Sequence, residues 1–194
     1  MLEAGLTKGV TIHFPAGTNF ETSRVHDTPQ EDTASVQNLT LTLSSKTYQT
    51  TSQVTYLPFS PGIINYAETD GDVLSGFFSG CFMPVYRKNG VRRVAHVATT
   101  EHVTEAGDCK DVMRRLLNTP EYELINSVKP YRDQDIARFR EIMQAENITD
   151  PMRIKVFGLV AADNRCYAVF TQKIADYEFK VVGRFDQTEN TENI

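Results

Sequence analysis

The sequence predicts an α+β fold, in which β-sheets of mixed or antiparallel strands pack in a sandwich-like arrangement with two or three helices at their side. Alternating apolar and polar residues occur toward both ends of the chain, and segments with helical periodicity lie between them. The 194 residues, of which 40% are hydrophobic and 23% charged, suit one compact unit with a sizeable core. We therefore expect a single domain over residues 1–194.

Four strands are predicted in the first half of the chain, at 9–14, 35–45, 53–59 and 61–67. Alternation supports the first two, β-branched and aromatic residues support the third, and a Pro-Gly turn precedes the fourth. Residues 15–34 are rich in Pro, Gly, Thr and acidic residues, which predicts a loop of low order.

Two helices are predicted in the middle of the chain. Asp108 can cap the first, which ends at 118–120, and Asp133 can cap the second, which ends near Asn147. The apolar residues recur at helical spacing, at Val112, Met113, Leu116 and Leu117 in the first helix and at Ile136, Phe139, Ile142 and Met143 in the second.

Three further strands are predicted after the helices, at about 152–160, 166–171 and 177–184. Turn residues at 163–165 and 171–173 separate them. The polar tail 186–194 is expected to be frayed.

Composition argues against several classes of protein. The net charge of −5 and the pI of about 5.4 leave no general footprint for nucleic acid, and no apolar run approaches the roughly 20 residues of a membrane helix. The first residues lack the basic start and apolar core of a Sec signal. The three cysteines are sparse and lack a metal-ligand spacing, so we expect reduced thiols, no metal and no other cofactor. We also expect a monomer.

One hairpin brings together the residues of greatest chemical interest. Asn89-Gly90 is a strong signal for a two-residue turn, which places Lys88 opposite Val91. Extending that register makes Cys81 and His96 diagonal neighbours on one face, roughly 7–8 Å apart at Cα. An imidazole can reach a thiol over that distance.

Two features qualify this hairpin. Pro84 lacks a ladder donor, so the strand that contains it is expected to be an edge strand or to carry a bulge. Residues 73–81 also fit a helical period, so Cys81 closes a helical turn in an alternative reading. In either reading Gly80 lets the backbone approach a substrate closely.

A cysteine beside a histidine suits acyl-transfer chemistry on an amide. The imidazole favours the nucleophilic thiolate, and the N–H groups around Ser79 and Gly80 can face a developing oxyanion. The alternative is a small buried cysteine beside a structural histidine. Cys109 and Cys166 are expected to be structural, and His102 is expected to be a loop residue.

Four basic residues crowd the tip of the same hairpin, namely Arg87, Lys88, Arg92 and Arg93. Such a cluster is usually a solvated turn. The functional alternative is a contact for an acidic patch on a protein substrate.

Five short segments, taken in order, resemble a known family. "TIHF", "YLPF", "SGFFSGC", "VAHV" and "DVMRRL" are similar to segments of the cytotoxic necrotizing factor and Burkholderia lethal factor-like family of bacterial glutamine deamidase toxins. The parallels extend to about residue 120.

The resemblance implies a role for each matching residue. Cys81 would attack a glutamine carboxamide, and His96 would move the protons. Ser75 stands where the lethal factor has a threonine that orients the histidine, and Ser79 matches a serine of the family motif. The spacing from cysteine to histidine is closer to that of the necrotizing factors.

The resemblance also implies a biological setting. The protein would be a bacterial effector or toxin that is secreted or injected without a Sec signal and acts in the target-cell cytosol. Its partner would be a host protein substrate, such as a small GTPase or a translation factor.

Two other classes remain open at this point. A cysteine peptidase or a transglutaminase would use the same thioester chemistry with a different bond or acceptor. A β-rich binding or immunity-type module would use no chemistry, with Cys81 in the core and the basic hairpin as the interface.

Overall fold

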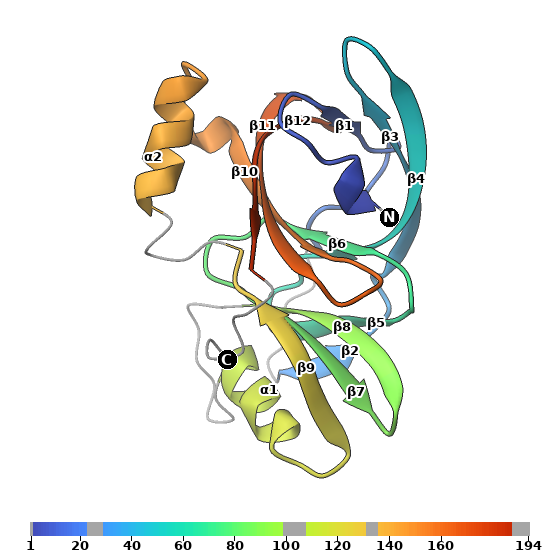
Figure 1. The fold of residues 1–194 in the computed structure, drawn as a ribbon. Coiled ribbons are helices and arrows are strands. Elements are labelled where there is room, and N and C mark those ends of the chain that lie inside the picture. The colour runs from blue at the N-terminus through green and yellow to red at the C-terminus, as the bar shows by residue number, and fades with distance from the viewer. Residues whose placement is uncertain (1, 23–28, 99–107, 131–135, 188–194) are drawn as a thin grey trace.

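A computed structural model of the chain describes residues 2–22, 29–98, 108–130 and 136–187. The fold is α+β with mixed sheets, as predicted. One sheet closes into a barrel, and a second sheet of five strands lies against one end of it (Figure 1). Cys81 and His96, the candidate site residues, belong to the region where the barrel and the second sheet meet.

The barrel is built from both halves of the sequence. Its strands are hydrogen-bonded in the order β1-β12-β11-β10-β6-β4-β3. Their bounds are β1 Thr11–His13, β3 Gln37–Ser44, β4 Gln49–Pro58, β6 Val73–Gly76, β10 Ile154–Val160, β11 Cys166–Ala175 and β12 Glu178–Asp186. All neighbours are antiparallel except β4 and β6, whose parallel pairing sets Leu57 opposite Ser75.

The second sheet has the order β2-β5-β8-β7-β9. Its strands are β2 Gln30–Asp32, β5 Ile63–Glu68, β7 Met83–Lys88, β8 Val91–Val97 and β9 Tyr122–Val128. The short edge strand β2 is parallel to β5, and the other pairs are antiparallel.

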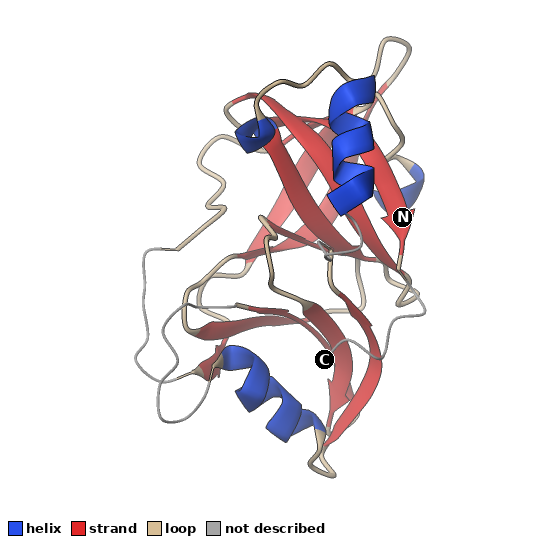
Figure 2. Cartoon of the chain, turned by 90° about the vertical axis from the view of Figure 1, so that its left-hand side faces the viewer, coloured by secondary structure: helices blue, strands red, loops and turns tan. Residues whose placement is uncertain are grey.

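Among the residues that the structure describes, two α-helices accompany the sheets (Figure 2). The helix α1 (Cys109–Leu117) begins at Asp108, the predicted cap, and Asp111 completes a capping box there. The helix α2 (Ile136–Ala145) runs beside the barrel (Figure 1), while Asp133, its predicted cap, lies outside the described residues, as does His102. Single 3-10 turns occur at Leu2–Ala4 and Pro151–Arg153. In the part of the chain described, no helix is long and apolar enough to cross a membrane.

The buried residues form three clusters. One fills the barrel, and another lies between the second sheet and α1. The third, which we call the junction core, joins the two sheets: it includes Leu57 and Val73 from the barrel and Cys81, Met83 and Val94 from the second sheet. The two sheets therefore share one hydrophobic core.

Strand β9 is absent from the sequence-based prediction, and its presence corrects the expected place of Pro84. Strand β7 lies between β8 and β9, so it is central rather than an edge. The ladder adapts through a register shift between Val85 and Tyr86 against β9, which is the predicted bulge. Next to Pro84, pairing with β8 is interrupted and resumes at the bridge between Phe82 and Val97.

Other boundaries also differ from the prediction. Residues 15–34 are not all loop, because β2 lies within them and Phe20 packs against the barrel core. The predicted turn at 171–173 lies inside β11, and the turn comes at Asp176-Tyr177 instead. Asp186 belongs to β12, and Gln187 is buried with its N–H bonded to the Cys166 carbonyl, so these first two residues of the predicted tail are not frayed. The rest of the predicted tail, 188–194, lies outside the described residues.

Candidate active site at the junction of barrel and sheet

The register of the β7–β8 hairpin is the predicted one. Asn89 and Gly90 form the turn with positive φ angles of 50° and 82°, and Lys88 pairs with Val91. The helical alternative for 73–81 is wrong, because residues 73–76 form β6 and a bend at Ser79 and Gly80 follows.

That register extends to the cysteine and the histidine. The Val97 N–H donates to the Phe82 carbonyl at 2.9 Å, so Cys81 and His96 stand on the same face as diagonal neighbours. Both are buried, with 2% and 1% of their surface exposed. The cysteine end of the hairpin is therefore inside the molecule, as expected.

Ser75 holds the imidazole through its side chain. Its Oγ lies 2.7 Å from His96 Nδ1 and 2.5 Å from the carbonyl oxygen of Leu57. A hydroxyl has one proton, and a carbonyl can only accept, so the Ser75 hydroxyl donates to Leu57. The hydroxyl must then accept from His96, which assigns the ring proton to Nδ1 and leaves Nε2 with a bare lone pair.

The surroundings of His96 keep the imidazole neutral. The Phe78 ring stacks on it with centroids 4.4 Å apart and planes 12° from parallel. Burial lowers the pKa of His96 from 6.5 to about 3. Nε2 has no hydrogen-bond partner among the residues that the structure describes, Cys81 included. A bare, unprotonated nitrogen therefore stands on the face that carries Cys81.

Asn65 lies directly across from His96 in the β5–β8 ladder and is fully buried. Its Nδ2 donates to the Pro58 carbonyl at 3.1 Å, which fixes the orientation of the amide because a carbonyl cannot donate. The other end, Oδ1, has no partner within the described chain. Two unpaired acceptors, Asn65 Oδ1 and His96 Nε2, thus belong to neighbouring side chains on one face of the sheet.

Cys81 lies in the junction core beside the start of α1. An ionised Cys81 would interact electrostatically with Cys109 and Lys110 in the first turn of that helix. Burial lowers the pKa of Lys110, whereas a negative charge on Cys81 favours its ammonium form. The interaction is mutual, so the Lys110 ammonium favours negative charge at Cys81.

The other two cysteines differ from Cys81 in their surroundings. Burial raises the pKa of the thiols of Cys109 and Cys166 to about 12 in each case. Both are fully buried, in agreement with the structural role expected for them.

Ser79 and Gly80, the predicted oxyanion and turn residues, form the bend before the nucleophile candidate. Ser79 is exposed while Cys81 is buried. Ser79 is therefore the exposed residue nearest to Cys81 in the sequence.

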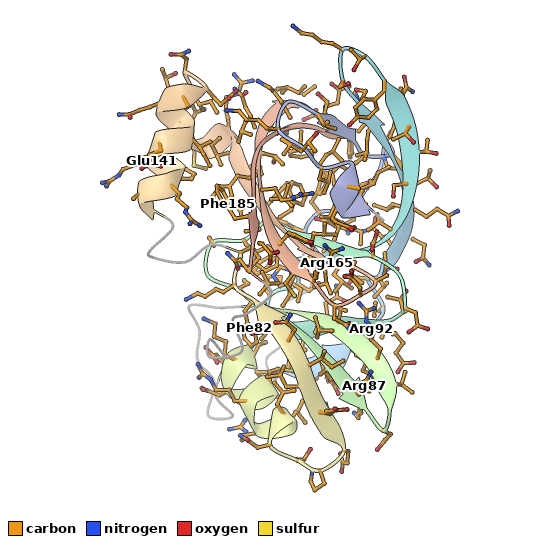
Figure 3. All side chains as sticks on the ribbon, in the orientation of Figure 1. Phe82, Arg87, Arg92, Glu141, Arg165 and Phe185 are labelled. Atoms are coloured by element: carbon orange, nitrogen blue, oxygen red, sulfur yellow. The ribbon has the colours of Figure 1, made fainter. Side chains whose placement is uncertain are left out.

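The basic residues of the hairpin are engaged within the molecule. Arg92 donates to Asn164 Oδ1 at 2.8 Å and to the carbonyl oxygens of Ala161, Thr69 and Gly71. Figure 3 shows it at the level where the sheet meets the barrel, with Arg87 farther along the sheet. Arg92 therefore ties β8 to the barrel loops.

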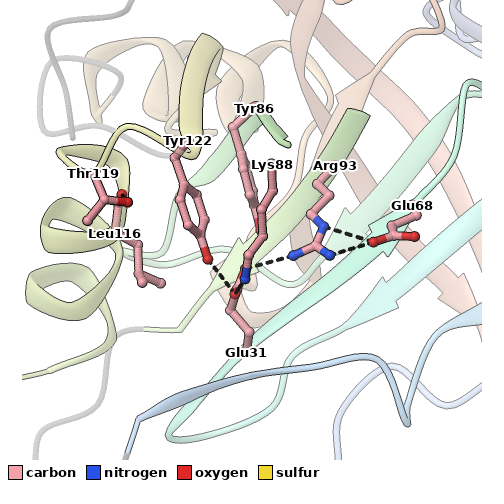
Figure 4. A network of polar contacts seen from close by, with 8 residues as sticks. All are labelled: Glu31, Glu68, Tyr86, Lys88, Arg93, Leu116, Thr119 and Tyr122. Atoms are coloured by element: carbon pink, nitrogen blue, oxygen red, sulfur yellow. Dashed lines mark hydrogen bonds and ion pairs between the residues drawn. The ribbon is translucent and has the colours of Figure 1, made fainter. Parts of the chain in front are cut away.

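The remaining three form ion pairs. Lys88 and Arg93 converge on Glu31, and Arg93 also binds Glu68 (Figure 4). Arg87 pairs with Glu123 and is the most exposed of these three, at 45% of its side chain. A role of the four in contacting a substrate stays a prediction, and Arg87 has the charge most open to solvent.

Comparisons with protein-family models, with curated proteins and with solved structures find no match. The resemblance of the short segments to the deamidase toxins therefore stays a prediction, and the site is interpreted from its own geometry.

Three surface cavities lie away from this site. The largest of the three, about 480 Å³, is lined by aromatic residues of the barrel and by two lysines, among them Phe20, Phe77, Tyr177, Phe179 and Lys155. None of the three is lined by Cys81 or His96. Within the described ranges, no group of three or more His, Cys, Asp or Glu side chains is placed to hold a metal ion.

Sequence reasoning missed two residues of the site. Asn65 reads as one polar residue in an apolar strand, and Lys110 as one charge in the first turn of a helix. The signal that was available for Asn65 is its place in "PGIINYA", where a polar side chain interrupts a run of buried residues. Such a residue needs an internal partner or a function.

Proposed function

We propose that the chain is a cysteine-dependent protein-glutamine deamidase. The observation that carries this proposal is the fixed tautomer of His96: Ser75 holds Nδ1–H, and Nε2 is left bare on the face that carries Cys81. A general base needs this state, and burial favours it by lowering the pKa of His96 well below its usual 6.5.

In the first half of the reaction, Cys81 attacks the carboxamide carbon of a substrate glutamine. His96 Nε2 takes the thiol proton, and a bond forms between sulfur and carbon. When the tetrahedral intermediate collapses, the carbon–nitrogen bond breaks and the imidazolium returns the proton to the nitrogen. Ammonia leaves, and the glutamyl thioester remains on Cys81.

In the second half, water replaces ammonia. His96 takes one proton of the water as the oxygen attacks the thioester carbon. The carbon–sulfur bond then breaks, the proton returns to sulfur, and the substrate leaves as glutamate. Neither half changes an oxidation state or requires a cofactor.

Charge is stabilised by groups around the thiol. Negative charge on sulfur is favoured by Lys110, and the backbone N–H groups at Ser79 and Gly80 are the candidates for the substrate oxyanion. The charge on the imidazolium is transient, because burial disfavours it.

The buried state of the site limits access. Both reacting side chains are almost fully covered, so the groups over them must shift when a substrate binds. A glutamine on a protein surface would enter from the exposed bend at Ser79. A folded-protein substrate, which must dock before this opening occurs, is consistent with such a site.

The resemblance described above supplies the biological context of the proposal. We propose a bacterial effector that reaches the cytosol of a target cell and modifies a host protein, such as a small GTPase or a translation factor. The exposed Arg87 is the candidate contact for an acidic patch on that protein.

The test is mass spectrometry of a eukaryotic cell lysate incubated with the protein. A glutamine converted to glutamate by the wild type and not by Cys81→Ala supports the proposal. Cys109→Ala and Cys166→Ala are matched controls, because they remove equally buried thiols and should retain the activity. A folded, thiol-intact protein that converts no glutamine would contradict the proposal.

The same spectra separate the alternatives. A cysteine peptidase would leave a cut chain, and a transglutaminase would leave a cross-link or an added amine. A binding module would leave every substrate mass unchanged, with Cys81 returned to a purely structural role.

A further inference from the structure

Two unpaired acceptors in the protein interior require an explanation. Asn65 Oδ1 and His96 Nε2 are buried, have no partner in the described residues and belong to side chains that face each other across β5 and β8. A buried acceptor without a donor costs roughly 1–3 kcal/mol in general. Such atoms persist where a ligand or a water supplies the donor.

Two consecutive carbonyl groups at the end of β4 fix the orientation of both acceptors. The Leu57 carbonyl accepts from Ser75, which in turn holds His96, and the Pro58 carbonyl accepts from Asn65. The orientation of each acceptor follows from a carbonyl that can only accept, so neither ring nor amide can turn over without losing a hydrogen bond. The pair is therefore built as a unit.

A pair of acceptors fits a group with two donors on one atom. The –NH₂ of a carboxamide is such a group, and so is water. An ester, a carboxylate and a tertiary amide have no N–H to offer. In the proposed reaction, the carboxamide nitrogen leaves as ammonia, and the hydrolytic water then occupies the same position.

We propose that Asn65 is a catalytic, specificity-determining residue whose Oδ1 accepts a hydrogen bond from the –NH₂ of the substrate carboxamide, while His96 Nε2 is kept for the thiol proton. The hydrolytic water then takes the place of the nitrogen and donates to both acceptors. This inference rests on the proposed function and adds to it the reason why a primary amide is selected. Asn65 binds the nitrogen in the ground state, and His96 gives that nitrogen the proton taken from Cys81.

Alkylation of Cys81 tests this without knowledge of the protein substrate. Iodoacetamide has a primary amide, and methyl iodoacetate is a neutral reagent of similar size without N–H. The rate at Cys81 is measured for each by mass spectrometry and divided by its rate with glutathione. Both reagents depend on the same opening of the site, so the ratio of the two normalised rates reports recognition of the amide.

We expect the wild type to favour iodoacetamide by about fivefold, which converts to about 1 kcal/mol, the size of one neutral hydrogen bond. Asn65→Ala should bring the ratio to about one. Gln187→Ala is the matched control, since it removes another buried amide whose oxygen is unpaired, at the end of β12, and should keep the ratio of the wild type.

The possible outcomes separate the two proposals. Fast alkylation of Cys81 with no preference for the amide in the wild type overturns the role of Asn65 and leaves the deamidase proposal standing. Alkylation of Cys81 no faster than that of Cys109 and Cys166 overturns the deamidase proposal and this inference with it. The measurement on the wild type decides the question even if Asn65→Ala does not fold.

Discussion

Two polar clusters are embedded in the second sheet, and they differ in how completely they are satisfied. At one end, the carboxylate of Glu31 accepts from Tyr86 at 2.8 Å, from Tyr122 at 2.8 Å and from Lys88 at 3.0 Å (Figure 4). At the other end, His96 and Asn65 of the sheet form a cluster with Ser75 of the barrel, in which two buried acceptors have no partner among the described residues.

The difference separates a structural cluster from a candidate reactive one. Glu31 comes from the short edge strand β2 and is bonded to side chains of β7 and β9, so it fastens that strand to the sheet. A saturated network of this kind adds stability and has no capacity for a further ligand. The two unpaired acceptors of the His96 cluster lower the stability of the fold until a ligand or water donates hydrogen bonds to them.

The largest expected effect concerns the thiol. Cys81→Ala should lower deamidation by at least about 10³-fold, since no other group can form the thioester. Thermal unfolding should change little, because the substitution deletes one atom from the junction core. Single-turnover assays on the substrate found in the lysate experiment measure the loss. Residual activity close to that of Cys109→Ala would remove Cys81 from the mechanism.

The next effect concerns the group that orients the base. Ser75→Ala leaves His96 Nδ1–H without its acceptor, and we expect a loss of about 30- to 100-fold in kcat/KM, from one lost hydrogen bond to a buried polar group. Ser75→Thr keeps a hydroxyl and should restore most of the activity. The two variants are compared at equal folded fraction. An alanine variant as active as the threonine variant would show that Ser75 has no orienting role.

The Glu31 cluster should respond in stability and not in chemistry. Glu31→Ala removes the acceptor of two tyrosines and a lysine, and should cost about 2 kcal/mol of unfolding free energy in urea. The alkylation ratio at Cys81 should stay unchanged. Glu123→Ala, which breaks the exposed pair with Arg87, is the control and should cost less than about 0.5 kcal/mol. A shifted alkylation ratio in Glu31→Ala would mean that the two clusters are coupled.

A change of pH also distinguishes the two clusters. The pKa of His96 is lowered by burial from 6.5 to about 3, so between these values the unfolded chain binds a proton that the folded chain does not. Stability should therefore fall as the pH drops from 6.5 toward 3, by at most about 1.4 kcal/mol per pH unit. His96→Gln should flatten this part of the profile.

The carboxylate of Glu31 affects stability over a lower range of pH. Burial works to raise its pKa, but the hydrogen bonds from Tyr86, Tyr122 and Lys88 outweigh burial, and its pKa lies below the usual 4.5. Its contribution is complete above 4.5 and is lost as the pH falls further. Urea titrations at several pH values, with both variants, measure the two windows. A slope between pH 6.5 and 4.5 that survives His96→Gln would contradict the assignment of that window to His96.

Local signals in the sequence predicted the local parts of the site. Asn89-Gly90 determined the turn, and the period of a strand then placed Cys81 and His96 on one face. Asp108 determined the start of α1. These predictions were correct because a turn, a register and a cap are decided within a few residues.

Other features were missed for the opposite reason. Strand β9 follows α1 and has no hairpin partner next to it in sequence, so its insertion beside β7 depends on burial of the whole sheet. Strand β2 was missed for the same reason: it has three residues, pairs with β5 about 30 residues later in the chain, and bonds through Glu31 to side chains that are distant in the sequence.

By itself, the sequence determined the α+β class, the hairpin register and the placement of Cys81 and His96 on the same face of the hairpin. The tertiary structure alone decided that Ser75 holds His96 by its hydroxyl, that Asn65 stands across from it, and that β4 anchors both. The physical reason is that these contacts join strands far apart in the chain, which meet only when the barrel closes and the second sheet buries its face against it.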